Sequence, residues 1–71
     1  MKDIFIEKLK YALEIEDYEI QMEDEFRNYD EWSSIAYLSV IAMLDEEYDI
    51  QIEEKEFKKI KTVRDMYNLT I

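Results

Sequence analysis

The chain has 71 residues, with 19 acidic and 9 basic side chains, and therefore a formal net charge of −10. This length predicts one small domain spanning residues 1–71, and the hydrophobic content of 48% is high enough for a folded core. Cysteine, histidine and glycine are absent, which excludes disulfides, thiolate or imidazole catalysis, conventional zinc sites and glycine-rich phosphate loops. We therefore expect a protein without catalytic residues and without a metal site.

The acidic residues are concentrated in the middle of the chain. Residues 14–54 contain fifteen acids and a single base, Arg27, whereas residues 55–71 contain five bases and two acids. Nucleic-acid binding depends on neutralising phosphates with basic side chains, so we expect no nucleic-acid partner. The charge favours a monomer that associates with basic surfaces on partner proteins. The apolar runs are too short for a membrane span, and the N-terminus lacks a basic region and long apolar core, so we expect a cytoplasmic protein.

The first predicted element is an amphipathic helix over residues 2–13. Phe5, Leu9 and Leu13 recur at helical spacing, and Ile4 and Ile6 are expected to widen this apolar stripe. The next segment, residues 14–32, contains apolar residues without a steady period and nine acids. We interpret it as a long ordered loop that includes a short helical turn and is held to the core by its aromatic side chains.

A second helix is predicted to begin near Ser33, because serine is a preferred residue at a helix start and an apolar run follows it. The run has two apolar stripes at helical spacing. One consists of Val40, Ile41, Leu44 and Tyr48, and the other of Ile35, Leu38 and Ala42. Such a helix is either central in the core or presents one face to a partner.

Two further helices complete the prediction. A short helix around residues 54–59 offers Phe57 to the core, and the last helix begins at Thr62, where Asp65 completes a capping-box pattern. Val63, Met66 and Tyr67 are expected to point inward from the last helix, with Leu69 and Ile71 near its end. The fold class is therefore all-α: a small irregular four-helix bundle, with three main helices, one short helix and a long first connection.

Three segments in this order resemble the acyl carrier protein family. That family has an Asp-Ser-Leu motif that begins the second helix, which ends in Leu-Glu-x-x-Phe/Tyr-Asp/Gly, and an Ile-x-Thr-Val start of the last helix. The corresponding segments here are Ser33–Ile35, Leu44–Asp49 and Ile60–Val63. Trp32 before the first segment is similar to a Trp-Asp-Ser-Leu variant of some stand-alone carriers outside primary fatty acid synthesis. Residues 1–30 match the family only in layout.

The resemblance implies that Ser34 is the attachment point of a covalent 4′-phosphopantetheine arm, added by a phosphopantetheinyl transferase. The arm would hold acyl or aminoacyl groups as thioesters and present them to acyl-loading and acyl-processing enzymes with basic docking surfaces. A serine in the first helical turn has an accessible hydroxyl, and the helix dipole favours an attached phosphodiester. Ala36 and Ser39 stand where many carriers of this family have carboxylates. The expected partner surface is therefore the apolar face of the second helix together with the acids at its end, and it consists of Ile35, Leu38, Ala42, Asp45 and Glu46.

Two differences from the family motif leave open both the attachment point and the function. Ser33 replaces the aspartate of the family, which removes a negative charge that modifying enzymes commonly read, and Ile35 replaces the leucine. Ser33 could itself be the modified residue, or both serines could serve only to begin the helix. The alternative function is an acidic interaction module that has the carrier fold and no arm. An enzyme that uses two carboxylates is a further class, although so short a chain has little room to enclose a substrate.

Trp32 and the apolar residues of the helix interior each have two possible roles. Trp32 is expected either to shield the base of the arm or to pack in the core, and packing is the simpler role for a large aromatic residue beside a helix start. An acyl chain could fold back against residues of the helix interior, for which ordinary core packing is again the simpler role. These residues are Val40, Leu44, Phe57, Ile60 and Met66.

Overall fold

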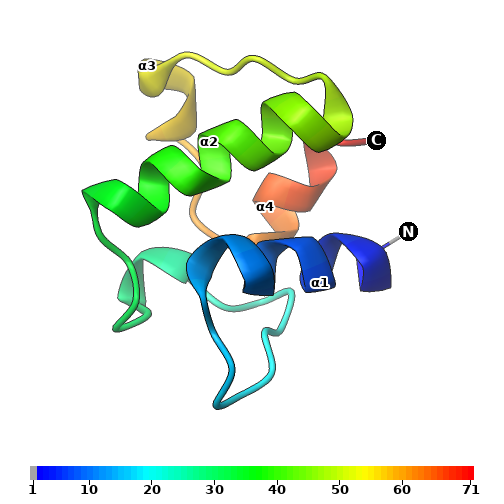
Figure 1. Ribbon diagram of the computed structural model, residues 1–71. Helices are drawn as coiled ribbons and strands as arrows, with labels where there is room; N and C mark the ends of the chain where they lie inside the picture. Colours follow the sequence, from blue (N-terminus) through cyan, green and yellow to red (C-terminus); the bar gives the residue numbers. More distant parts are fainter. Residues whose placement is uncertain (1) are drawn as a thin grey trace.

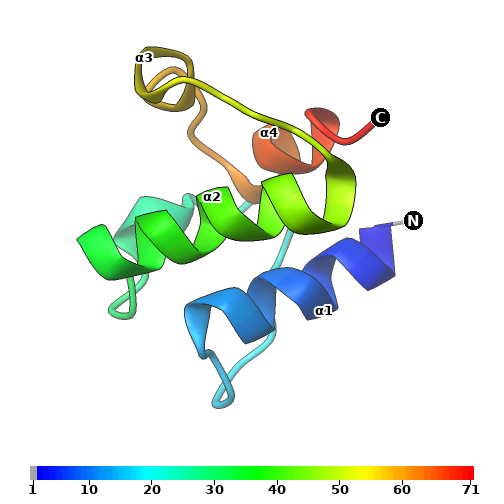
Figure 2. The same cartoon turned by 45° about the horizontal axis from the view of Figure 1, so that its top comes forward.

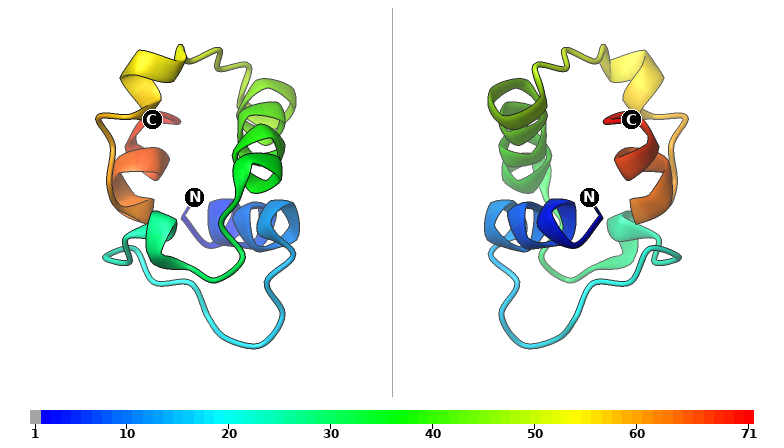
Figure 3. Two further views of the ribbon diagram at one scale, coloured as in Figure 1. Left: turned by 90° about the vertical axis from the view of Figure 1, so that its left-hand side faces the viewer. Right: turned by 90° about the vertical axis from the view of Figure 1, so that its right-hand side faces the viewer.

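The computed structural model describes residues 2–71, which form a small bundle of helices joined by irregular segments (Figure 1). The helices are α1 (Lys2–Leu13), the 3-10 turn η1 (Phe26–Asn28), α2 (Ser34–Tyr48), α3 (Glu54–Phe57) and α4 (Val63–Asn68). Helices α1 and α2 run side by side in opposite directions, and α3 and α4 lie across the core from them (Figures 2 and 3). The predicted all-α architecture is confirmed. Within residues 2–71, no helix is both long and apolar enough to cross a bilayer.

Helix α1 has the expected bounds and buries the expected stripe. Phe5, Leu9 and Leu13 are fully or almost fully buried, because their spacing places them on the side that faces the rest of the bundle. Ile6 is half-buried, but Ile4 is 54% exposed, so the prediction that Ile4 widens the buried stripe is wrong. Ile4 precedes Phe5 by one residue, which turns it about 100° away from the core.

The end of α1 directs the chain into the long loop. Glu14 adopts a left-handed conformation with φ 56°. Its N–H donates to the carbonyl of Tyr11 at 3.2 Å, and the N–H of Ile15 donates to the carbonyl of Lys10 at 3.0 Å. This hydrogen-bond pair defines a Schellman motif, whose following residue is commonly apolar and packed. Ile15 fulfils that role, because it is only 2% exposed.

The loop between α1 and α2 is ordered by apolar residues and by long-range backbone hydrogen bonds. Ile20, Met22 and Phe26 are buried in the core, and η1 provides the short helical turn that the sequence predicts. The N–H of Val63 donates to the carbonyl of Asp24 at 2.9 Å, and the N–H of Arg64 donates to that of Met22 at 2.8 Å. These bonds attach the middle of the loop to the start of α4.

Arg27 connects the loop to α3. Its guanidinium donates to the carbonyl of Phe57 at 2.9 Å and to the carbonyl of Ile60. The same guanidinium lies over the aromatic rings of Phe26 and Phe57, at 4.9 and 5.3 Å from their centroids. A planar guanidinium can make two such bonds and stack on an aromatic ring at once. The single base of the acidic middle segment therefore holds a four-residue helix that is too short to be stable alone.

Helix α2 supplies one face to the core and one to solvent. Ala36, Val40, Met43 and Leu44 are buried, and Ile41 and Tyr48 are half-buried. The stripe of Ile35, Leu38 and Ala42 is exposed. The helix ends at Asp49, which is left-handed with φ 56° and whose N–H donates to the carbonyl of Asp45.

Helix α4 begins with the predicted capping box. The Thr62 hydroxyl accepts from the N–H of Asp65 at 3.1 Å, and the Asp65 carboxylate accepts from the N–H groups of Lys61 and Thr62 at 2.9 and 3.2 Å. These backbone donors lower the pKa of Asp65. Val63 and Met66 are buried as expected, and Tyr67 is half-buried. Leu69, just after the end of the helix, still packs against the core. Ile71 is 82% exposed, so its predicted inward position is wrong.

Candidate functional site

The candidate site begins at the N-terminal end of α2, where two adjacent serines have different environments. Ser33 has extended backbone angles, and its hydroxyl accepts a hydrogen bond from the N–H of Ala36 at 3.1 Å. Ser34 is the first residue of the helix and is exposed. Within residues 2–71, no hydrogen bond joins the Ser34 side chain to another group. The cap is therefore made by Ser33, and the hydroxyl of Ser34 faces solvent.

The segment before the two serines is held by aromatic packing. Trp32 is half-buried and stacks on Phe57, with 6.2 Å between ring centroids and planes 6° apart. It also meets Phe26 edge-on at 5.0 Å, and its backbone N–H donates to the carbonyl of Tyr29 at 3.0 Å. Core packing is thus the role that the structure shows for Trp32. The packing fixes where the chain enters α2.

Two tyrosines join the acidic loop near this end of α2. Tyr18 donates to the Glu31 carboxylate at 2.6 Å, and Tyr29 donates to Asp24 at 2.6 Å. Desolvation and the bond to Glu31 raise the pKa of Tyr18 to about 12, and desolvation and the bond to Asp24 also raise the pKa of Tyr29. Both phenols therefore stay protonated and donate hydrogen bonds to carboxylates.

The five residues of the predicted partner surface lie together on the exposed face of α2. Ile35 is 74% exposed and Leu38 63% exposed, which are large values for aliphatic side chains. Ala42, Asp45 and Glu46 continue the same face toward the C-terminal end of the helix and are also exposed. The structure therefore brings these residues into one apolar strip with an acidic end, starting one residue after Ser34.

The residues considered for contact with a folded-back acyl chain form the interior. Val40, Leu44 and Met66 are completely buried, and Phe57 is 2% exposed. Ile60 is half-buried against the same cluster. Core packing is the role that the structure shows for them.

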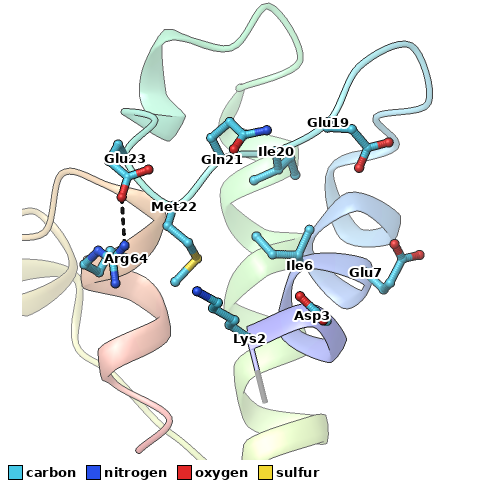
Figure 4. Close-up of a pocket in the computed structure, with 10 residues that line it drawn as sticks. All are labelled: Lys2, Asp3, Ile6, Glu7, Glu19, Ile20, Gln21, Met22, Glu23 and Arg64. Carbon is cyan, nitrogen blue, oxygen red and sulfur yellow. Dashed lines mark hydrogen bonds and ion pairs between the residues drawn. The ribbon is translucent and has the colours of Figure 1, made fainter.

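A hollow of about 470 Å³ lies between the first half of α1, residues 19–23 and the start of α4. Figure 4 shows the side chains that line it. Ile6, Ile20 and Met22 form its apolar part. At its rim, Arg64 and Glu23 form an ion pair at 2.7 Å, and this hydrogen bond lowers the pKa of Glu23. Lys2 also lines the hollow, but Arg64 is already paired and the four carboxylates of Asp3, Glu7, Glu19 and Glu23 outnumber the two bases, so the chemistry of the hollow does not suit an anion. Ser34 does not line it.

A second hollow of about 1200 Å³ follows the line between α1 and α2. It includes Tyr11, an aromatic residue that is 87% exposed and has no function predicted from its sequence position. The sequence indicates the exposure of Tyr11, because this residue lies outside the stripe of Phe5, Leu9 and Leu13 and should therefore face solvent.

Comparison with solved structures relates this architecture to a known fold. The chain superposes on the solution NMR structure of a holo acyl carrier protein from Geobacter metallireducens with a TM-score of 0.79 and 22% sequence identity, covering 96% of this chain and 78% of that one. The fold is that of an acyl carrier protein. No family model matches the sequence. No curated protein matches it either.

The carrier fold agrees with the layout that the three sequence segments indicate. The first segment lies at the start of α2, the second at its end, and the third at the start of α4. Ser34 therefore occupies the first position of the second long helix, where the sequence resemblance places the modified serine of carriers.

Proposed function

We propose that this protein is an acyl carrier, with a 4′-phosphopantetheine arm attached through the hydroxyl of Ser34. The observation that carries the proposal is the solvent-facing hydroxyl of Ser34 at the first position of a 15-residue helix within an acyl carrier fold. The protein itself would catalyse no reaction. The arm supplies a thiol, which the chain lacks, and this thiol holds acyl or aminoacyl groups as thioesters.

The arrangement of the two serines supports Ser34 over Ser33 as the attachment point. A phosphodiester on Ser33 would turn the Oγ that accepts from the N–H of Ala36 into an ester oxygen, which is a weaker acceptor, and would place a bulky group at the helix cap. The hydroxyl of Ser34 can be esterified without breaking a hydrogen bond. A phosphodiester there would lie beside the unpaired N–H groups of the first turn, where the helix dipole favours a negative charge. The first turn contains no acidic side chain to repel it.

The surface beside Ser34 supports docking of partner enzymes. Ile35 and Leu38 follow Ser34 on the exposed face of α2, and Asp45 and Glu46 lie at its far end. An apolar strip with an acidic end fits an enzyme surface that combines an apolar patch with basic side chains. A phosphopantetheinyl transferase and enzymes that load or process acyl groups are the partners that this function requires. The cytoplasm is the compartment that we propose for it.

The experiment is intact mass measurement after incubation with coenzyme A, Mg²⁺ and a broad-specificity phosphopantetheinyl transferase. We expect one arm on the wild-type protein and none on Ser34→Ala. The variant Ser33→Asp is the matched control, because aspartate removes the hydroxyl but retains the helix cap. It should accept one arm. Ser39→Ala, another serine of α2, should also accept one arm.

An acidic interaction module without an arm remains the second candidate, favoured by Ser33 in place of the aspartate of carriers. If Ser33→Asp is modified and the wild-type protein is not, the loss of that charge has abolished modification and the second candidate is correct. If Ser33→Asp accepts no arm and Ser34→Ala accepts one, the attachment point is Ser33. If several transferases modify neither the wild-type protein nor Ser33→Asp, the carrier proposal is contradicted.

A further inference from the structure

The second hollow is a groove between α1 and α2, the two helices that lie side by side in Figure 3. Its apolar lining comes from both helices and from the turn after α1. This lining consists of Tyr11, Ala12, Ile15, Ala42 and Met43. On α2 the lining extends from Ser39 to Glu47, which at 1.5 Å per residue is about 12 Å, or roughly two helical turns.

Tyr11 is the most exposed of the large apolar side chains, at 87%. Its hydroxyl has no hydrogen-bond partner within the part of the chain that the structure describes. Ala42 belongs both to the groove and to the exposed strip of Ile35 and Leu38. Tyr11 therefore extends that strip across the groove onto α1. Tyrosine is enriched among the residues that dominate binding energy at protein interfaces.

The charges around the groove decide what can occupy it. Five acids and two lysines line it. Lys8 is paired with Glu47 at 2.6 Å, and Lys10 with Glu19 at 3.2 Å, so both lysines are already neutralised. Glu7, Glu14, Glu16 and Glu46 line the groove without an ion pair to any residue from 2 to 71. An acidic rim of this kind repels a second copy of a chain with net charge −10, and it repels a free fatty carboxylate.

We propose that the groove between α1 and α2 binds a basic amphipathic helix of a partner protein, with Tyr11 as the central contact. The groove lies between antiparallel helices, is about two turns long, and has both apolar side chains and unpaired carboxylates in its lining. A helix with an apolar stripe flanked by Lys and Arg fits each of these features. The proposal deepens the proposed carrier function, because it specifies the partner element and adds α1 to the surface of α2. Binding in this groove does not need an arm on Ser34.

The test uses a synthetic helical peptide of about four turns, or ~14 residues, with leucines at i, i+3, i+4 and i+7 and lysines on both sides of them. The control peptide has the same composition in an order that destroys the apolar stripe. Binding is measured by calorimetry and by amide chemical shifts on the full chain carrying Ser34→Ala. We expect the amphipathic peptide to bind at least about tenfold more tightly than its scrambled form. The shifted amides should cluster at residues 7–16 and 39–47.

Two pairs of variants separate the groove from general charge attraction. Tyr11→Ser should weaken peptide binding about tenfold, whereas Ile71→Ser, at a comparably exposed residue on α4's side of the molecule, should not change it. Glu46→Gln should weaken binding about threefold at low salt. Glu54→Gln removes the same charge from another exposed helical position outside the groove and should change it less.

Equal binding of the two peptides to the Ser34→Ala protein would overturn the proposal, as would amide shifts in that protein that cluster away from the groove. Equal effects of Tyr11→Ser and Ile71→Ser would also overturn it. Concentration-dependent dimerisation that Tyr11→Ser abolishes would assign the groove to a second copy instead. Because the peptide test uses Ser34→Ala, its result is independent of modification. If the peptide binds but the wild-type protein accepts no arm, the groove proposal stands and the carrier function fails. If the wild-type protein accepts an arm but the peptide does not bind, the carrier function stands and the groove proposal fails.

Discussion

Glu14 and Asp49 stand where many proteins have glycine. Both residues have φ 56°, and both lie at the C-terminal end of a long helix. A left-handed conformation costs a residue with a Cβ atom roughly 1–2 kcal/mol relative to its right-handed form. The chain contains no glycine, so it bears this cost at both helix ends. Aspartate is among the residues that enter this region more readily, whereas glutamate is not.

Leu44 tests the packing of α2 at the residue scale. It is completely buried, so Leu44→Ala should lower the free energy of unfolding by about 2–5 kcal/mol through lost apolar burial and a residual cavity. Leu38→Ala is the matched control on the same helix. Leu38 is 63% exposed, and its removal should change stability by no more than about 0.5 kcal/mol. Urea unfolding monitored by circular dichroism measures both. Similar losses in the two variants would mean that α2 is rotated relative to this structure.

At the scale of elements, the two shortest helices depend on contacts from elsewhere in the chain. Helix α3 has four residues and α4 has six, and neither would be stable in isolation. The Arg27 guanidinium donates hydrogen bonds to the carbonyls of Phe57, at the end of α3, and Ile60, just after it. The first two N–H groups of α4 donate to carbonyls of the loop, at Asp24 and Met22. The long loop is therefore a structural partner of both helices.

The capping box of α4 predicts a pH dependence. Backbone hydrogen bonds from Lys61 and Thr62 lower the pKa of Asp65 in the folded state, so the folded state favours the ionised carboxylate. The stability that this provides is present above the unfolded pKa of an aspartate, about 3.9, and is lost as the pH falls through the lowered folded pKa. Asp65→Ala should therefore cost about 1 kcal/mol at pH 7 and much less at pH 2–3.

The measurement is the difference in unfolding free energy between wild type and Asp65→Ala at each pH, because taking the difference cancels the effect of protonating the other acids. Asp30→Ala is the control, since Asp30 is exposed and caps no helix. A cost of Asp65→Ala that stays constant from neutral to acidic pH would contradict the role of the ionised carboxylate.

At the scale of the whole molecule, negative charge exceeds what the ion pairs can balance. Five ion pairs occur within residues 2–71, and those between elements join Lys8 to Glu47, Lys10 to Glu19 and Arg64 to Glu23. Most of these side chains are substantially exposed, so each pair contributes little. The remaining carboxylates repel one another in the compact state.

We therefore expect added NaCl or divalent cations to stabilise the fold. Screening should raise the melting temperature by roughly 5 °C, which corresponds to about 1 kcal/mol for a domain of this size. Thermal unfolding by calorimetry at increasing salt measures the shift. A variant with Glu16→Gln and Asp17→Asn removes two exposed charges and should show a smaller increase. A melting temperature that does not respond to salt in either protein would mean that repulsion between carboxylates is unimportant.

The sequence by itself determined the approximate position and type of the helices and the caps at the N-terminal ends of α2 and α4. The apolar period of residues 2–13, the cap at Ser33 and the pair of Thr62 and Asp65 are local signals, because each depends on residues within one or two turns. The same local reasoning placed Ser34 at the first helical position with a free hydroxyl. The predicted modification of Ser34 and the predicted partner surface come from a resemblance, and they stay predictions until the mass and binding measurements are made.

The tertiary structure alone decided which stripe of α2 is buried and which distant segments meet. Helix α2 is apolar on two stripes, so its periodicity could not show that Leu44 faces the core and Leu38 faces solvent. The path of residues 14–32 depends on hydrogen bonds from Val63 and Arg64, which are 39 and 42 residues away from their partners in the sequence and leave no local pattern. The groove beside Tyr11 exists only because α1 and α2 pack side by side. Burial and long-range pairing are properties of the assembled helices, since their free energy depends on partners that no single segment contains.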